Sequence, residues 1–297
     1  MPNRTSILII LTVIFSAGVT PIVIRITQNA GMPSLVIVFI RLWLITFLLF
    51  PLIWTRHRQQ LMAVTPKQWQ LGLIAGFWLA INLFMLFLAL EYTSVLMTSV
   101  LRRTTPLWIL APEVIFLGAV ATPRTIMSLV MTFGGVVLIA LGATGGLDLG
   151  SQPLIGAGMA LFGAICFGIY LLLGRRLNDM PSLLYSWIVF VSAAIVTTIF
   201  LMITRTPVLG YPPVGYLWTL LVTFLAQVLG HMVINLGLQR FSATAMSIIL
   251  QVGVVLSAVI AAFLFNEIPT TWQLIGSALV IVGVVLATID QSQRVTA

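Results

Sequence analysis

Long apolar runs separated by short polar connections follow one another along the whole chain. Each run is close to or above the roughly 20 residues that a helix needs to cross a bilayer. None of them alternates apolar and polar residues with a period of two, as the strands of a membrane β-barrel do. The pattern predicts an all-α integral membrane protein with ten transmembrane helices. These predicted spans cover residues 6–26, 34–54, 70–90, 94–118, 125–143, 154–174, 182–204, 215–237, 242–265 and 271–289.

The composition excludes a water-soluble protein. Of the 297 residues, 60% are hydrophobic and only 7% are charged, whereas soluble domains carry roughly 25% charged residues. A disordered chain is excluded too, because it would be poor in apolar and aromatic residues. The single cysteine, Cys166, allows no intrachain disulfide, and no cysteine spacing typical of a metal site is present. We expect neither a metal nor a cofactor.

The basic residues predict the orientation of the chain. The 14 Lys and Arg residues exceed the 6 Asp and Glu residues, and such an excess usually marks cytoplasmic loops of membrane proteins. With the N-terminus in the cytoplasm, only Arg25 and Arg205 lie outside, while Arg41, Arg102 and Arg103 fall inside spans. Both termini are therefore predicted to be cytoplasmic. The remaining nine basic residues lie inside: Arg4, Arg56, Arg58, Lys67, Arg124, Arg175, Arg176, Arg240 and Arg294.

The sequence contains an internal repeat with an offset of 148 residues. The tetrapeptide Met-Pro-Ser-Leu occurs at 32–35 and again at 180–183, and Gly-Val-Val-Leu occurs at 135–138 and 283–286. We expect one repeat at 1–148 and a second at 149–297. Because each repeat holds five spans, an odd number, the second enters the membrane from the opposite side. The sequence therefore predicts two inverted five-helix repeats.

Inverted repeats are typical of secondary transporters, which bind substrate near the midplane between the halves and rock to give alternating access. We therefore expect a carrier for a small metabolite. An alternative is a membrane channel or receptor-like protein without alternating access. A duplication that merely doubled a helical bundle would explain the repeat without any transport cycle.

Several motifs resemble one transporter family. The stretch 89–94 (Ala-Leu-Glu-Tyr-Thr-Ser), followed by Pro106, resembles the junction of the third and fourth helices in the drug/metabolite transporter superfamily, EamA type. Residues 266–269, 273–276 and 283–286 resemble the closing pattern of that family, and Arg41 falls where it often has an arginine. The resemblance implies a ten-helix carrier of the cell (inner) membrane that exports or exchanges small metabolites. The chain departs from symmetry at Glu267, whose counterpart in the first half is Ala119.

The fourth span carries ionisable residues, which are costly in a bilayer and usually face a cavity or a partner. Arg102 and Glu113 share a helical face but lie about 16 Å apart along the axis, at 1.5 Å per residue. Pro106 and Pro112 lie between them and would bend the helix. At the offset of 148, position 102 corresponds to Leu250.

Position 103 corresponds to Gln251, and Ser99 and Ser247 lie one turn earlier on the same faces. We predict that Ser99/Arg103 and Ser247/Gln251 face each other across a central cavity. Arg103 would then bind the carboxylate or phosphate of an anionic or zwitterionic substrate, with Arg102 as the second candidate. The alternative is a structural arginine paired with helix-end carbonyls or with Glu113.

Other polar residues recur at helical spacing within spans. The eighth span carries Gln227, His231 and Asn235 at i, i+4 and i+8, which keeps them on one stripe. In the third span Trp78 and Asn82 have the same spacing, and Tyr170 lies in the sixth. We expect these residues to line the cavity. A histidine can instead be a packing residue, and tryptophans near span ends are often interface anchors.

Coupling to protons requires a titrating group in the membrane, and only Glu113 and His231 lie well inside spans. No Walker motif is present, and with two histidines in different segments we assign no catalytic residue. The expected partners are a small-molecule substrate and the lipid bilayer, without nucleic acid, and a monomer is the simplest form. Amino acids, organic anions and amphipathic drug-like molecules all remain candidate substrates.

Overall fold

The computed structural model describes residues 4–102, 152–177, 180–241 and 270–295 continuously, with scattered residues between 104 and 138 and between 246 and 265. Side chains 96, 99, 273, 284 and 287–295 are outside this description. Within the described residues every regular element is a helix. The expected all-helical fold class is confirmed for this part of the chain.

The described helices fall into two sets, one in each half of the sequence. The first set is α1 (Arg4–Asn29), α2 (Ser34–Arg56), the short α3 (Arg58–Met62), α4 (Pro66–Tyr92) and α5 (Val95–Arg102). The second set is α8 (Pro153–Arg176), α9 (Ser182–Thr204), α10 (Pro213–Thr223), the π-helical segment η1 (Phe224–Met232), α11 (Val233–Leu238) and α13 (Thr271–Val295). Because α10, η1 and α11 follow one another without a break, they form one helical rod.

Six helices of the described chain are long and apolar enough to cross a membrane: α1, α2, α4, α8, α9 and the α10–η1–α11 rod. Their outward faces carry large apolar side chains such as Phe47, Ile203 and Leu217, and lipid can accept such faces because helices satisfy their own backbone hydrogen bonds. The predicted spans 94–118, 125–143 and 242–265 lie largely outside the described residues. The number of ten spans therefore stays a prediction.

Local sequence signals set where several helices begin. Thr65 and Gln68 form a reciprocal capping box at the start of α4, in which the Gln68 amide N–H donates to Thr65 Oγ1 at 3.3 Å. Pro66, Pro153 and Pro213 occupy first-turn positions of α4, α8 and α10, where a missing N–H has no cost.

The internal repeat is visible in the helix bounds. Shifting α2 by 148 positions gives 182–204, which are the bounds of α9. The same shift places α1 at 152–177, which is within one residue of each end of α8. It places α4 at 214–240, which is within two residues of each end of the α10–η1–α11 rod. Each of the three long helices of the first half thus has a counterpart of nearly the same length.

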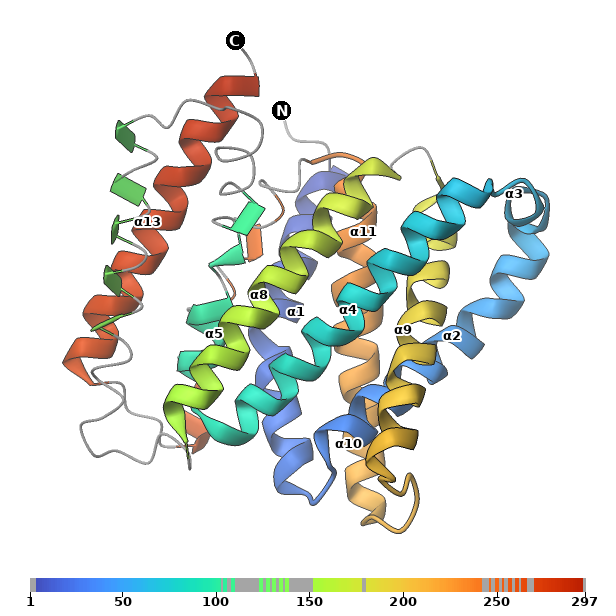
Figure 1. The fold of residues 1–297 in the computed structure, drawn as a ribbon, viewed down its shortest axis with the longest axis horizontal. Helices are drawn as coiled ribbons and strands as arrows, with labels where there is room; N and C mark the ends of the chain where they lie inside the picture. Colours follow the sequence, from blue (N-terminus) through green and yellow to red (C-terminus); the bar gives the residue numbers. More distant parts are fainter. Residues whose placement is uncertain are drawn as a thin grey trace.

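Counterpart helices run in opposite directions. Arg25, near the end of α1, donates from Nη2 to the carbonyl oxygen of Thr93, just after α4, at 2.8 Å. At that same end of α4, the amide N–H of Gln152 donates to the carbonyl oxygen of Tyr92 at 3.3 Å, immediately before α8. The start of α8 therefore lies where its counterpart α1 ends, and the two helices are antiparallel (Figure 1).

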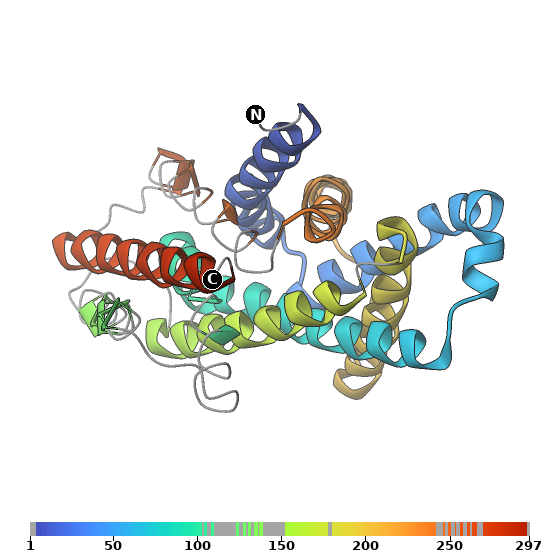
Figure 2. The same cartoon turned by 90° about the horizontal axis from the view of Figure 1, so that it is seen from above.

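The halves interlock rather than lying side by side as separate bundles. The first-half helix α4 packs against α8 and α9, and α1 packs against the α10–η1–α11 rod. Figure 2 shows α4 running alongside α8, and α1 beside the rod, which is seen end-on. Small residues permit the close approach: a Cβ on Gly76 of α4 would lie 2.5 Å from the carbonyl oxygen of Val189 on α9.

Candidate functional site

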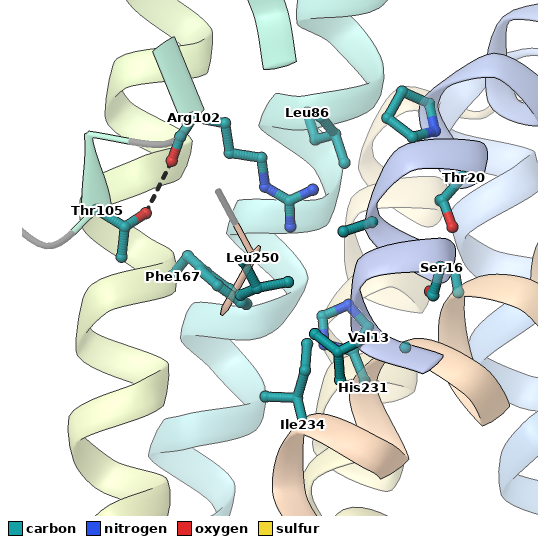
Figure 3. A pocket seen from close by; sticks show the side chains of 14 residues that line it. Val13, Ser16, Thr20, Leu86, Arg102, Thr105, Phe167, His231, Ile234 and Leu250 are labelled. Carbon is teal, nitrogen blue, oxygen red and sulfur yellow. Dashed lines mark hydrogen bonds between the residues drawn. The ribbon is translucent and has the colours of Figure 1, made fainter. Parts of the chain in front are cut away.

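A cavity lies between the two halves, where α1, α4 and α5 face α8, η1 and α11 (Figure 3). It contains about 710 Å³ of empty space, its open mouth included. Its polar lining residues are Ser16, Thr20, Arg102, Thr105 and His231, and most of its remaining wall is apolar. Its apolar lining residues include Val13, Leu86, Phe167, Ile234 and Leu250.

Residues related by the repeat line this cavity in pairs. Leu86 and Ile234 are 148 positions apart, as are Arg102 and Leu250, and all four are lining residues. Equivalent positions of the two repeats therefore line the same cavity. Transporters with inverted repeats bind substrate at such an interface between the repeats. Its charge is asymmetric, because the arginine of one half corresponds to a leucine in the other.

Arg102 is held at the cavity wall by neighbours on α4 and α8. Its Nη2 donates to Asn82 Oδ1 at 3.1 Å, and its guanidinium lies over the ring of Phe167, 5.1 Å from the centroid. Asn82 is itself fixed, because its Nδ2 donates to the carbonyl oxygen of Gly163 at 2.7 Å. Figure 3 shows the guanidinium extending from α5 into the cavity. One nitrogen thus anchors a side chain that lines the cavity.

His231 reaches the cavity from the π-helical segment η1. Its ring makes edge contacts with Phe167 and Tyr170, with centroids 6.1 and 5.9 Å apart, and Nδ1 has no hydrogen-bond partner. π-Helical insertions are frequent at functional sites. Here the neighbouring Gly230 lies so close to α1 that a Cβ would be 2.8 Å from Ser16 Oγ.

A buried hydrogen-bond chain supports the ring of Tyr170 beside His231. The Tyr170 hydroxyl donates to Asn235 Oδ1, and Asn235 Nδ2 donates to Ser186 Oγ at 2.9 Å. Ser186 donates in turn to the carbonyl oxygen of Ser182 at 2.7 Å. The chain links α8, α11 and α9, all of the second half, and holds the aromatic wall of the cavity in place.

Arg41 on α2 lies behind the cavity and is only 1% exposed. Its Nη2 donates to Gln227 Oε1 of η1 at 2.6 Å, and its guanidinium lies 5.4 Å from the centroid of Phe87. Its other two nitrogens, Nε and Nη1, have no partner. Leu86, which precedes Phe87, and Ala226, which precedes Gln227, both line the cavity.

Apart from Trp78, the structure separates the predicted site residues into three groups. Arg102 and His231 line the cavity, while Asn82, Tyr170, Gln227 and Asn235 are buried around it and hold other side chains. Trp78 is half-buried with its edge toward Phe77 and is not a lining residue. The third group lies outside the described residues: Arg103, Glu113, Ser247, Gln251 and the side chain of Ser99.

Sequence reasoning missed several lining residues. Phe167 carries no polar signal in an apolar span and could not be distinguished from lipid-facing phenylalanines. Ser16 and Thr20 are spaced i, i+4 on α1, which is a pattern that could have marked a cavity face. In the part of the chain that the structure describes, no three His, Cys, Asp or Glu side chains gather as metal ligands would.

Comparisons with known proteins agree with the fold and the repeat. The model of the EamA-like transporter family matches residues 4–141 and again residues 154–289. A Bacillus subtilis (strain 168) protein, the uncharacterised transporter YyaM, is 26% identical over 210 residues, covering 68% of this chain and 67% of its own. A protein of known crystal structure aligns with a TM-score of 0.65 at 18% identity, covering 98% of both chains. That likeness concerns the fold alone.

Proposed function

This chain belongs to the EamA-like transporter family, and from that premise we propose that it is a secondary transporter that moves a small metabolite by alternating access. The family and the name of the relative indicate a multi-pass membrane transporter rather than an enzyme. The mechanism proposed here adds a cycle in which the two halves rock around one binding site.

The observation that carries this proposal is the cavity between the halves. Repeat-related residues, Leu86 with Ile234 and Arg102 with Leu250, line the same space. A site between two such repeats can open to one side of the membrane when the halves pack in one arrangement. It can open to the other side when the two repeats exchange their arrangements. A channel would have less need of two halves that exchange roles.

The proposed topology has ten spans in two inverted five-helix repeats, 1–148 and 149–297, in the inner membrane. Both termini are cytoplasmic in this topology, in keeping with the basic loops. The first turn of α1 and the last turn of α13 lie at the same end of the molecule (Figure 1), which supports an even number of crossings. The transporter acts as a monomer with a small-molecule substrate and lipid as its partners, without a cofactor.

We assign substrate binding to the cavity and the residues around it. Arg102 and His231 contact the cargo. Asn82 positions Arg102, and Tyr170, held by Asn235, positions His231, while Gln227 holds Arg41 behind the cavity. The roles expected for Arg103, Ser99, Ser247, Gln251 and Trp78 remain part of the proposal. Export or exchange is the proposed direction, and Glu113 and His231 are the candidates for proton coupling.

The experiment is tracer uptake into proteoliposomes containing the full chain, screened over amino acids, organic acids and amphipathic cations. A carrier gives uptake of at least one solute that saturates with concentration, because each cycle moves a bound molecule. Flux that rises linearly with concentration, or conductance that does not saturate, would show the channel alternative instead.

A further inference from the structure

Buried hydrogen-bond donors without partners gather behind the cavity. Arg41 Nε and Nη1 and Gln227 Nε2 are all buried and unpartnered. The single acceptor in this group, Gln227 Oε1, is already used by Arg41 Nη2. These donors lie behind the lining residues Leu86 and Ala226, so they contribute a positive potential to the cavity rather than direct contacts to a ligand.

Within the described residues, the cationic charge of this region has no counter-ion. Arg41 and Arg102 lie within electrostatic range of each other and of His231, and the described chain offers neither arginine a carboxylate within bonding distance. Two guanidinium groups in a low-dielectric interior repel each other, and each is costly to bury. A bound anion would offset both costs at once.

The geometry of Arg102 suits an oxyanion. Its hydrogen bond to Asn82 and its position over Phe167 fix the plane of the guanidinium, and the guanidinium extends into the cavity (Figure 3). A planar donor fork of this kind binds carboxylates through two parallel hydrogen bonds. Thr20 Oγ1, which is buried and unpartnered, faces the same cavity from α1 and can donate a further hydrogen bond.

The remaining wall is apolar. Val13, Leu86, Ile234 and Leu250 line it, with the Phe167 ring beneath Arg102. No acidic side chain is among the described lining residues, so the cavity as described offers no carboxylate to an ammonium group. The cargo that fits combines one acidic group with an apolar body.

We propose that the cargo is a small organic anion, with its acidic group bound by Arg102 and its apolar body against Leu86, Ile234 and Leu250. This proposal specifies the substrate class of the proposed transport function, and it rests on that function. Arg41 contributes its charge from behind the wall formed by Leu86 and Ala226 and does not touch the cargo. Arg41 is therefore a positioning residue, while Arg102 is the binding residue.

The test is thermal unfolding of the purified full chain in detergent with charged and neutral probes of similar shape. The anionic probes are benzoate, phenylacetate and phenyl phosphate, benzamide is the neutral probe, and benzylamine is the cationic one. We expect at least one anion to raise the Tm in a saturable way, as a ligand of the native state does. Benzamide and benzylamine should leave the Tm unchanged.

Variants assign the effect to the site. Arg102→Gln should weaken the apparent affinity for the anion at least about tenfold, because a charge-assisted bidentate contact is lost. Arg102→Lys should bind with intermediate affinity, since a point charge replaces the fork. The control is Arg176→Gln, an exposed arginine at the end of α8, which should bind as the unmodified protein does.

Three outcomes would overturn the inference: stabilisation by none of the anions, equal stabilisation by benzamide or benzylamine, or unchanged anion affinity in Arg102→Gln. If that variant does not fold, Leu250→Glu replaces it, because a carboxylate on the same cavity wall should abolish anion binding. Retained binding in Leu250→Glu would contradict the proposal. Saturable uptake of neutral or cationic solutes only would contradict the proposal of an anionic cargo but not the proposed transporter function. Absence of any saturable uptake would contradict the transporter function itself.

Discussion

The guanidinium of Arg41 on α2 and the amide of Gln227 in η1 are joined by a hydrogen bond of 2.6 Å that crosses from one half of the protein to the other. Both residues are buried, at 1% and 0% exposed. Among the described residues, Gln227 is the one hydrogen-bond partner of the Arg41 guanidinium. This contact therefore couples the packing of the two halves to a charge behind the cavity.

Removing the acceptor of this bond should destabilise the protein. Gln227→Leu leaves Arg41 with no hydrogen-bond partner, and breaking a buried charge contact costs about 3 kcal/mol. We expect a clear fall in Tm in detergent. Because the penalty arises from the stranded charge, the double variant Arg41→Met/Gln227→Leu should recover most of the loss, and additive losses in the double variant would contradict this account.

The close crossing of α4 and α9 should be sensitive to a single methyl group. In Gly76→Ala the new Cβ would lie 2.5 Å from the carbonyl oxygen of Val189, so the helices must separate, at a cost of about 2 kcal/mol. Gly158→Ala on α8 is the matched control, because its Cβ would meet nothing within 4 Å. Equal Tm values for the two variants would be inconsistent with the packing described.

The chain of buried hydrogen bonds behind His231 makes a third prediction. Tyr170→Phe removes the donor to Asn235 Oδ1 and leaves that oxygen buried without it, which costs about 1–3 kcal/mol. Because the ring beside His231 then loses its anchor, substrate affinity should fall with stability. Tyr211→Phe, which removes an exposed hydroxyl bonded to the carbonyl oxygen of Pro207, should change neither quantity.

The proposed topology can be tested by labelling engineered cysteines from one side of the membrane. The only natural cysteine, Cys166, is buried. Gln60→Cys in α3 should react from the cytoplasmic side and Leu209→Cys, between α9 and α10, from the outside; both positions are exposed. Labelling of both from the same side would exclude the predicted arrangement of spans.

The sequence was sufficient to predict the six long apolar helices of the described chain and the division into two repeats, because membrane spans carry a strong apolar signal. Residues 182–204 were predicted as a span, and α9 has those bounds. The start of α4 was placed at residue 70 instead of Pro66, since the first turn contains Lys67 and Gln68 and is polar. Capping by Thr65, rather than hydrophobicity, determines that boundary.

The site was less predictable, for a physical reason. A polar side chain within a span requires a polar partner or a cavity, and the structure places Arg102 and His231 on the cavity wall. The pattern does not reveal whether the partner is cargo or another side chain. Gln227 and Asn82 have the same kind of signal, yet they bind Arg41 and Arg102. The π-helical register of η1 also leaves no trace in the spacing of apolar and polar residues.

The most direct test of the central claim is counterflow. Proteoliposomes containing the full chain are loaded with an unlabelled organic anion that stabilises the protein, and uptake of the labelled anion is followed from low external concentration. A carrier with one alternating site predicts a transient accumulation above equilibrium, which Arg102→Gln abolishes and Arg176→Gln preserves. Uptake that approaches equilibrium without accumulation, or an accumulation that Arg102→Gln leaves unchanged, would contradict a carrier that binds its anionic cargo at Arg102.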